Sequence, residues 1–376
     1  MHWYFHDMIK PFPKKFAVST YSNLKVNFRF ITPQDLSYDR NHGPIPHICA
    51  DKHFVRVDGL VKTPLSFSAD QLRSDFAQHE VTCALECAGN RRHTMRTRLS
   101  EVEGIDWGDG AVMNCKWEGP RIRDVLLRTG LGDDVIQKSH EIHVAFACYQ
   151  VRCQEDHWFG SSVTLERCLR EDCDAIIALK VNDGPLTANH GYPLRVVLPG
   201  ITGARWVKWL DRITIQAKES PNFYQQYDYK ILPPEAVNEE SAEKHRSRTS
   251  PMYDTPINSV IAIPAEGEYV YLPSTGTVKV KGYAVPQGAD GPITCVEVSG
   301  DQGRSWVNAK LNASTYTSRW CWALWTADVR LAPGQKREII SRASDAGGNM
   351  QRSHSTWNLR GMGYNGYGRT TNLTVM

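Results

Sequence analysis

The chain has 376 residues, of which 41% are hydrophobic and 23% charged, a balance that excludes a mostly disordered protein. Its 44 Lys and Arg residues against 41 Asp and Glu leave a net charge of only +3, without a basic block, so we expect no nucleic acid partner. No apolar run is long enough to span a bilayer, so we expect no membrane partner. At roughly 150 residues per domain, this length predicts two or three domains.

Patterns of strands and helices alternate over the first two-thirds of the chain. A strand is predicted at Phe54–Val57, with a hairpin or a bulge directly after it. Ser68 and Gln71 have the spacing of a capping box, so a helix should begin after Ser68. A second helix is predicted over 121–129, because its Ile, Val and Leu residues fall on one face and a glycine follows.

Three apolar runs predict further strands at Asp174–Val181, Leu194–Leu198 and Trp206–Ile215. The composition then changes near residue 230. Residues 238–251, NEESAEKHRSRTSP, have no hydrophobic periodicity, which indicates a linker or a long surface loop. This segment separates the mixed part of the chain from a part in which strands dominate.

After this segment, short strand patterns follow one another closely, separated by Gly, Pro and Asp turns. This rhythm is typical of an all-β sandwich. The 11 Trp and 15 Tyr residues of the chain indicate large packed surfaces or a ligand pocket. The predicted strands are Ser259–Ile263, Val278–Val285, Ile293–Val298, Trp320–Trp325 and Glu338–Ala343.

The ten cysteines in 376 residues are too few for a disulfide scaffold. The N-terminal sequence, MHWYFHDMIKPFPKKF, has neither the apolar core of a signal peptide nor the Arg- and Ser-rich character of an organelle presequence. We therefore expect reduced thiols in a soluble intracellular protein, located in the cytoplasm or in an organelle such as the mitochondrion or the peroxisome.

Polar functional groups gather in four short segments, at 40–44, 87–92, 189–195 and 203–209. Together they supply Arg, His and Lys donors on glycine-bounded loops, which suits an anionic ligand. In the second segment, CAGNRR, two arginines follow closely after Cys87. Neighbouring positive charge lowers the pKa of a thiol, so Cys87 is a candidate thiolate.

Other roles for Cys87 are also compatible with the local sequence. A lone cysteine in an apolar run is most often a core residue. Cys83 and Cys87 with His93 suggest zinc, but a structural zinc site needs four convergent ligands and no second pair has suitable spacing. A cysteine nucleophile of the protease type is a further alternative, although the residues after the thiol offer no evident oxyanion site.

The motif CAGNRR resembles the molybdenum-ligating motif of the sulfite oxidase and assimilatory nitrate reductase family. Other landmarks of that family occur in the family's order, among them RNHG at 40–43, DQGRSW at 301–306 and WNLRG at 357–361. The resemblance extends over most of the chain, so it carries more weight than any single motif.

This resemblance implies an α+β fold with two domains. It places a mixed α/β molybdenum-cofactor domain at residues 1–235, a linker at 236–252 and an all-β immunoglobulin-like sandwich at 253–376. The second domain serves dimerisation in this family, so we expect a homodimer. The family's metal carries a pterin dithiolene, oxo ligands and one cysteine thiolate, which implies a molybdenum–molybdopterin cofactor.

The resemblance also assigns roles to single residues. Cys87 matches the metal ligand, a soft sulfur donor of the kind that suits this metal. Gln150 departs from the pattern, because many relatives carry an acidic residue at that place, and we assign it no role. The residues that match the family's cofactor contacts are Arg40, Asn41, His42, His190, Arg195, Trp206, Val207 and Lys208.

Two positions distinguish the chemistries of this family. Sulfite oxidases have an Arg in the WNLR motif and a Tyr in the DYK motif, and this chain has Arg360 and Tyr229 at these places. Nitrate reductases have sequences that resemble WNLM and DN there. Sulfite bears more charge than nitrate and needs a more cationic pocket. Arg40, Arg92 and Trp107 match the remaining pocket residues, so the resemblance implies oxidation of sulfite to sulfate by oxygen-atom transfer.

Two other functions stay open on the sequence. One is the molybdenum domain of a nitrate reductase-like enzyme, and the other is a non-catalytic dimeric paralogue. Haem-bearing relatives carry a His-Pro-Gly-Gly segment that this sequence lacks, and no flavin or NAD(P)H module follows the strand-rich part. We therefore expect neither haem nor flavin in this chain, and electrons passed to oxygen or to a separate acceptor.

Overall fold

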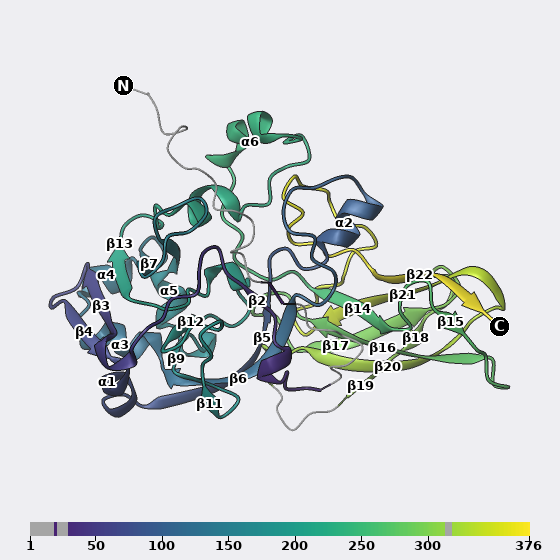
Figure 1. The fold of residues 1–376 in the computed structure, drawn as a ribbon, viewed down its shortest axis with the longest axis horizontal. Helices are drawn as coiled ribbons and strands as arrows, with labels where there is room; N and C mark the ends of the chain where they lie inside the picture. The colour runs from purple at the N-terminus through teal and green to yellow at the C-terminus, as the bar shows by residue number, and fades with distance from the viewer. Residues whose placement is uncertain (1–18, 21–28, 313–317) are drawn as a thin grey trace.

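The computed structural model describes residues 19–20, 29–312 and 318–376. Figure 1 shows two regions: strands and helices of the first part of the chain on the left, and an elongated stack of strands from the last third on the right. The prediction of an α+β fold is therefore confirmed. None of the helices in the described part of the chain has both the length and the apolar character needed to cross a bilayer.

The first region is built on two larger sheets and a two-stranded one. The five-stranded sheet is antiparallel except for one parallel pair, and its order is β4 (Leu65–Ser68), β3 (Phe54–Gly59), β13 (Arg212–Gln216), β7 (His143–Cys148) and β8 (Phe159–Thr164). The four-stranded antiparallel sheet has the order β11 (Gly184–Pro185), β10 (Lys180–Val181), β6 (Val112–Pro120) and β5 (Gln78–Glu86). The small sheet pairs β12 (Arg195–Val197) with β9 (Ile176–Ala178).

Short helices connect these strands. As predicted, Ser68 caps the first of them: its side chain accepts a hydrogen bond from the Gln71 backbone, and the Gln71 side chain accepts one from the Ser68 backbone. The helices are α1 (Ala69–Ser74), α2 (Arg92–Arg98), α3 (Ile122–Arg128), α4 (Asp133–Gln137), α5 (Leu165–Leu169) and α6 (Glu239–Arg246), with a 3₁₀ turn at Gly203–Arg205 and a π-helical turn at Tyr224–Asp228.

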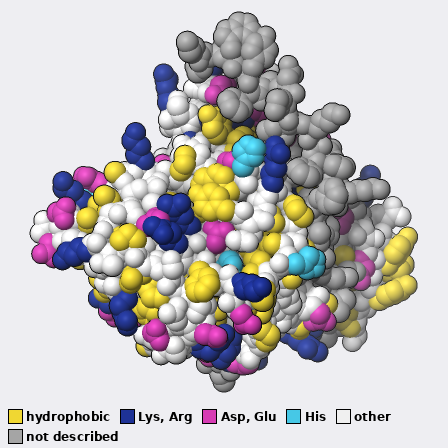
Figure 2. Space-filling view, turned by 60° about the vertical axis from the view of Figure 1, so that its left-hand side comes forward, with side chains coloured by type: hydrophobic (Ala, Val, Ile, Leu, Met, Phe, Trp, Pro, Cys, Tyr) yellow, Lys and Arg dark blue, Asp and Glu magenta, His cyan; other side chains and the backbone are white. Residues whose placement is uncertain are grey.

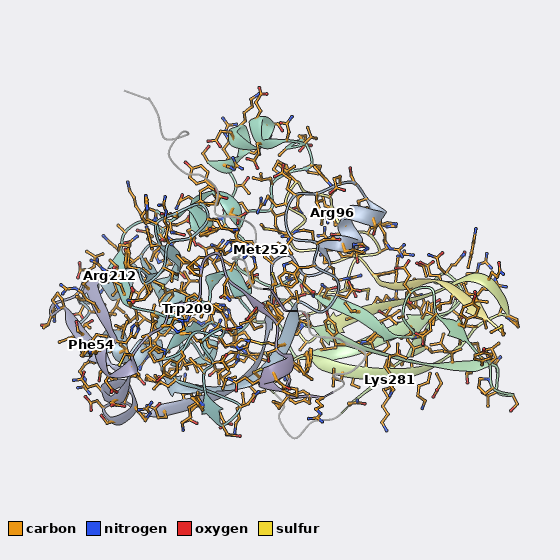
Figure 3. The ribbon with its side chains drawn as sticks, in the orientation of Figure 1. Phe54, Arg96, Trp209, Arg212, Met252 and Lys281 are labelled. Carbon is orange, nitrogen blue, oxygen red and sulfur yellow. The ribbon has the colours of Figure 1, made fainter. Side chains whose placement is uncertain are left out.

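Three of the predicted strands are wrong in extent. The strand predicted at Trp320–Trp325 begins only at Ala323 and runs to Arg330. The run Asp174–Val181 forms β9 and β10, which belong to different sheets. In Trp206–Ile215 only the last residues are a strand, because Trp209 adopts a φ of 53° and this left-handed conformation breaks the extended backbone. Trp209 lies in the interior of the first region (Figure 3), beside the cavity that Lys208 also lines.

The segment predicted to be a linker or surface loop contains the helix α6, so the loop prediction is wrong for residues 239–246. Asn238 caps this helix by accepting a hydrogen bond of 2.8 Å from the Ser241 backbone, and the Ser241 hydroxyl accepts one from Asn238. Ala242 is the only residue of the helix that is buried. A helix that lies on the surface needs no apolar stripe, which explains why hydrophobic periodicity did not reveal it.

The second region is the predicted all-β sandwich. Its core contains Val280, Val298, Trp325 and Ile339, which pack between the two sheets. One sheet has the order β14 (Asn258–Ile263), β16 (Thr277–Val285), β20 (Ala323–Arg330) and β19 (Lys310–Leu311). The other has the order β15 (Tyr269–Val270), β22 (Gly368–Val375), β21 (Gly334–Asp345), β17 (Ile293–Ser299) and β18 (Val307–Asn308).

The two regions share a tightly packed junction. Trp320, which precedes β20, is buried in the core of the first region, and its carbonyl accepts a hydrogen bond of 2.9 Å from Ala84 of β5. The segment 346–367, between β21 and β22, returns to the first region, where the Arg360 carbonyl accepts a hydrogen bond from Arg92 of α2. Gly363 of the same segment donates a hydrogen bond to Ala88, in the loop that follows β5.

The surface of the first region carries charges of both signs. In Figure 2, Lys and Arg side chains are interspersed with Asp and Glu on the face turned toward the viewer. This mixture agrees with the small net charge of +3. The cationic groups that matter for the site lie instead in the interior.

Candidate active site

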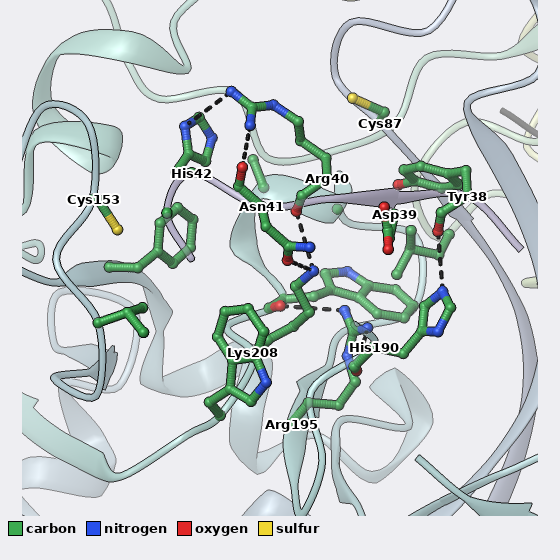
Figure 4. Close-up of a pocket in the computed structure, with 18 of the residues that line it drawn as sticks. Tyr38, Asp39, Arg40, Asn41, His42, Cys87, Cys153, His190, Arg195 and Lys208 are labelled. Atoms are coloured by element: carbon green, nitrogen blue, oxygen red, sulfur yellow. Dashed lines mark hydrogen bonds between the residues drawn. The ribbon is translucent and has the colours of Figure 1, made fainter. Parts of the chain in front are cut away.

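Two cavities meet at Cys87. The inner cavity extends from Cys87 to Lys208, Arg195 and His190 (Figure 4). The outer cavity is lined by Arg92, Trp107, Arg360 and neighbouring residues. Four residues belong to the walls of both, namely Arg40, His42, Cys87 and Tyr229. The thiol therefore lies at the boundary between a deep chamber and a second chamber beside it.

The loop after β5 holds the Cys87 thiol in place. The Cys87 backbone donates a hydrogen bond of 2.9 Å to the Ala111 carbonyl, and the Gly89 backbone donates one of 3.4 Å to the Cys87 sulfur. A side chain on Gly89 would meet the guanidinium of Arg92 at 2.5 Å. The glycine thus allows Arg92 to fold back across the loop, close to the sulfur.

Burial dominates the electrostatics of this thiol. It raises the pKa of Cys87, although the positive charges of Arg92 and Arg40 act in the opposite direction. The arginines thus lower this pKa, as predicted, but in the protein alone burial outweighs them, because a buried thiolate loses the stabilisation that water gives to its charge. All ten cysteines are free thiols.

The inner end of the inner cavity is a buried cluster of cationic groups. The Lys208 ammonium donates to the carbonyls of Arg40 (3.1 Å) and Asn189 (2.8 Å) and contacts the side-chain oxygen of Asn41. Arg195 donates to the carbonyls of His190 (3.0 Å) and Trp206 (3.3 Å). These groups converge from loops that are far apart in the sequence.

Burial and mutual repulsion disfavour positive charge in this cluster. Burial, followed by the charges of Lys208 and Arg195, lowers the pKa of His190 to about 4. Burial also lowers the pKa of Arg195 to about 10, and burial together with Arg195 lowers the pKa of Lys208 well below its usual range. A bound anion would remove this penalty, so the cluster suits a phosphate group.

Two buried polar atoms in the inner cavity indicate what kind of ligand fits there. Asp39 Oδ1 and Asn41 Nδ2 have no hydrogen-bond partner among the described residues, and both residues line the inner cavity. Unpaired buried polar atoms are rare in folded proteins, because each one costs free energy. An acceptor and a donor beside a cationic cluster fit a polar cofactor with N–H groups, acceptor atoms and a phosphate.

Trp206 and Val207 occupy different positions, although they are adjacent in the sequence. Trp206 lines the inner cavity and donates a hydrogen bond of 2.9 Å from its indole to the Ile201 carbonyl. Val207 is fully buried and its carbonyl accepts a hydrogen bond from Val196. Of the predicted cofactor contacts, Val207 alone does not line the inner cavity.

The outer cavity brings together the five residues that the sequence suggested for substrate binding, Arg40, Arg92, Trp107, Tyr229 and Arg360. Arg92 donates two hydrogen bonds of 2.8 Å, one to the Arg360 carbonyl and one to the Ile105 carbonyl. Trp107 is buried and packs edge-on against Tyr38, with ring centroids 6.1 Å apart. These contacts hold the walls of the cavity in place.

Sequence reasoning missed the acidic partners of Arg360. Its guanidinium forms an ion pair of 2.6 Å with Asp228 and lies 3.9 Å from Glu103. Burial, the largest single cause, lowers the pKa of Arg360, but Asp228 together with Tyr229, Glu103 and Glu239 outweighs it, so the pKa of the guanidinium is raised. The position of Asp228, directly before Tyr229 in the DYK motif, was the one available signal for it.

A chain of hydrogen bonds links Arg40, His42 and Tyr229. Arg40 Nη2 lies 3.3 Å from His42 Nδ1, and His42 Nε2 lies 2.7 Å from the Tyr229 hydroxyl. A guanidinium can only donate hydrogen bonds, so His42 Nδ1 must be the acceptor. Burial and the charge of Arg40 lower the pKa of His42, so its ring is neutral and carries its one proton on Nε2. Tyr229 therefore accepts from His42 and keeps its own hydrogen to donate.

Gln150 lies outside both cavities. Its side-chain amide donates a hydrogen bond of 3.1 Å to Asp211, whose carboxylate also accepts from the Tyr149 backbone. Burial raises the pKa of Asp211, and these two donors oppose that shift. The structure thus gives Gln150 a structural partner on an exposed turn.

Two domain families match the chain. The model of the oxidoreductase molybdopterin-binding domain matches residues 42–224, and the model of the Mo-co oxidoreductase dimerisation domain matches residues 249–373. The first match contains Cys87 and the cationic end of the inner cavity. The second contains the sandwich and Arg360.

Characterised relatives resemble nearly the whole chain. Sulfite oxidase of Gallus gallus is 36% identical over 341 residues, covering 89% of this chain and 71% of the relative, and sulfite oxidase of Arabidopsis thaliana is 36% identical over 348 residues, covering 89% and 86%. Nitrate reductase [NADH] of Volvox carteri is 35% identical over 359 residues, covering 92% of this chain and 40% of the relative.

A solved structure supports the fold. The sulfane dehydrogenase SoxCD from Paracoccus pantotrophus matches with a TM-score of 0.77 and 21% identity, covering 98% of this chain and 90% of that chain. Together, the site and these similarities define a molybdopterin-binding oxidoreductase. The chain belongs to the sulfite oxidase family, as the sequence resemblance predicted.

Proposed function

We propose that this enzyme oxidises sulfite to sulfate and passes the electrons to oxygen or to a separate acceptor. The observation that carries the proposal is the outer cavity beside Cys87, which combines three guanidinium groups with the Tyr229 hydroxyl. Sulfite is a compact anion with up to two negative charges, so it is stabilised by several convergent cationic donors. Relatives named as sulfite oxidases share 36% identity with this chain.

The inner cavity suits the molybdenum–pterin cofactor. Cys87 would hold the metal through its sulfur, and Lys208, Arg195 and His190 would hold the phosphate. Arg40, Asn41, His42 and Trp206 line the cavity between these two ends, with Val207 behind them. When bound, the cofactor supplies the two-electron oxygen-atom transfer by which sulfite becomes sulfate.

The residues of the outer cavity bind and orient the substrate. Arg40, Arg92 and Arg360 would contact the oxygen atoms of sulfite, and Trp107 would exclude water from one wall. Asp228 holds the Arg360 guanidinium through the ion pair of 2.6 Å. Arg360 is thus positioned before the substrate arrives, which lowers the entropy cost of binding.

Tyr229 contributes a hydrogen-bond donor. Burial and the nearby Asp228 carboxylate raise its pKa, so the hydroxyl stays protonated at neutral pH. Because His42 donates to the phenol oxygen, the hydroxyl hydrogen is available for an anion in the outer cavity. Tyr229 would therefore hold the substrate and product anions and retain its proton at the hydroxyl.

Nitrate reduction is the second candidate, because a nitrate reductase is also among the relatives. The experiment combines metal analysis with optical spectra of the purified holoenzyme. We expect molybdenum in the protein, bleaching of its visible spectrum by sulfite, and no reoxidation of the reduced enzyme by nitrate. If sulfite does not bleach the enzyme but nitrate reoxidises enzyme that an artificial electron donor has reduced, the protein is a nitrate reductase; purified protein without molybdenum would indicate a non-catalytic paralogue.

We further propose that the chain forms a homodimer through the sandwich. The match to a dimerisation domain supports this assembly. The tryptophans Trp320, Trp322 and Trp325 are buried within the chain, so they are not available for contacts with a second copy. Tyr269 and Tyr271 are exposed on the sandwich and remain available for a partner.

A further inference from the structure

Arg91 is a buried arginine that no step of the proposed reaction uses. Its side chain lies four residues after Cys87 and is almost fully buried. Its backbone adopts a φ of 65°, a left-handed conformation that is unfavourable for a residue with a side chain. A strained and buried charge persists only where the surrounding structure compensates for it, so its contacts indicate what it does.

The contacts of the Arg91 guanidinium come mainly from the sandwich region, which we define as residues 258–376. It donates to the Asn258 side chain (2.7 Å) and to the carbonyls of Gly366 (2.8 Å) and Tyr367 (3.0 Å). It also lies over the Tyr364 ring, 4.5 Å from its centroid. The planar guanidinium group of Arg91 thus connects the loop after β5 to both β14 and the segment 346–367.

Other residues of the same loop are tied to the sandwich region as well. The Ala88 carbonyl accepts a hydrogen bond of 2.8 Å from Gly363. The Asn90 side chain donates to the Tyr283 hydroxyl at 3.0 Å. Three of the four residues that follow Cys87, namely Ala88, Asn90 and Arg91, are therefore held by the sandwich region.

We propose that Arg91 is a positioning residue that fixes the Cys87 loop against the sandwich region. The sandwich region is then a structural wall of the metal site and not only an assembly module. The consequence for the metal follows only if Cys87 is the ligand, as proposed above. The orientation of the Cys87 loop by Arg91 can be measured without the cofactor.

The test uses the full-length protein with Arg91→Met and Arg91→Lys, and Val280→Ala as a control. Val280 lies in the sandwich core, so its truncation lowers stability without touching the Cys87 loop. The primary readout is the rate at which N-ethylmaleimide alkylates Cys87 in the cofactor-free protein, measured by peptide mass spectrometry. Cys83, buried in β5, serves as the internal reference.

We expect Arg91→Met to raise the Cys87 alkylation rate at least about 10-fold relative to Cys83, because the loop loses several buried hydrogen bonds at once. Arg91→Lys keeps the positive charge but loses the planar guanidinium group, so its Cys87 alkylation rate should lie between those of the wild type and Arg91→Met. Val280→Ala should leave the ratio unchanged at a temperature well below its melting point. The holoenzyme of Arg91→Met should also lose most of its molybdenum on gel filtration.

Equal alkylation ratios in Arg91→Met and Val280→Ala would overturn the proposal, since Arg91 would then contribute only to overall stability. If Arg91→Met does not fold, Arg91→Lys and Asn258→Ala carry the same comparison. A raised Cys87 rate with unchanged molybdenum content and sulfite turnover would support the positioning role and contradict the assignment of Cys87 as metal ligand. The two proposals can thus fail separately.

Discussion

Replacing Arg360 by Met removes one of the three guanidinium groups from the outer cavity. A hydrogen bond to a charged substrate in a partly desolvated site contributes about 1.5–3 kcal/mol, or roughly 10–100-fold in kcat/KM. The substitution also leaves Asp228 without its partner at 2.6 Å, and the side chain of Asp228 is only 7% exposed. An unpaired carboxylate in the cavity repels sulfite, so we expect a loss near the upper end, about 100-fold.

The double variant Arg360→Met with Asp228→Asn separates these two contributions. It removes the positive charge and the uncompensated negative charge together. The kcat/KM should recover about 10-fold relative to the single variant, which corresponds to ~1.4 kcal/mol of repulsion between Asp228 and the substrate. Arg360→Lys, which keeps the charge, should lose less than Arg360→Met.

The assay is the kcat/KM for sulfite of each variant across a salt series. The wild-type value should fall as salt rises, because the attraction of an anion is screened over a Debye length of about 10 Å at 0.1 M. Arg360→Met should show a shallower slope, since part of the attractive field is gone. Equal values and equal slopes in the two proteins would refute the reasoning, and the preference for sulfite would then depend on Tyr229 alone.

Three further predictions concern the metal, the assembly and the pH dependence. Cys87→Ser should nearly abolish sulfite turnover while the melting temperature stays close to the wild-type value, because a hydroxyl is a poor ligand for this metal; full turnover would exclude Cys87 as the ligand. Sedimentation at micromolar concentration should give a dimer, and a monomer would remove the assembly proposal. The pKa of His190 falls from its usual 6.5 to about 4, so between these values the unfolded chain binds more protons than the folded one. The cofactor-free protein should therefore lose about 3 kcal/mol of stability as the pH falls from 6.5 to 4. Urea unfolding across this range should show a weaker pH dependence in His190→Gln, and identical curves would contradict a buried neutral His190.

The sequence alone determined features that depend on short stretches of chain. The capping box at Ser68, the strand rhythm of the sandwich and the CAGNRR motif each lie within a few residues, where local geometry and chemistry are set by the order of side chains. The family and the fold class followed from such local patterns. They also indicated which side chains to look for in a site.

Only the tertiary structure decided how these side chains act on one another. It paired Arg360 with Asp228, oriented His42 toward Tyr229 and placed α6 in a segment without apolar periodicity. It also showed that burial outweighs the nearby arginines at Cys87 and raises the pKa of its thiol. Burial and charge pairing depend on groups that come together from distant parts of the chain. The spacing of residues within a motif therefore cannot show how much hydration a group loses when it is buried.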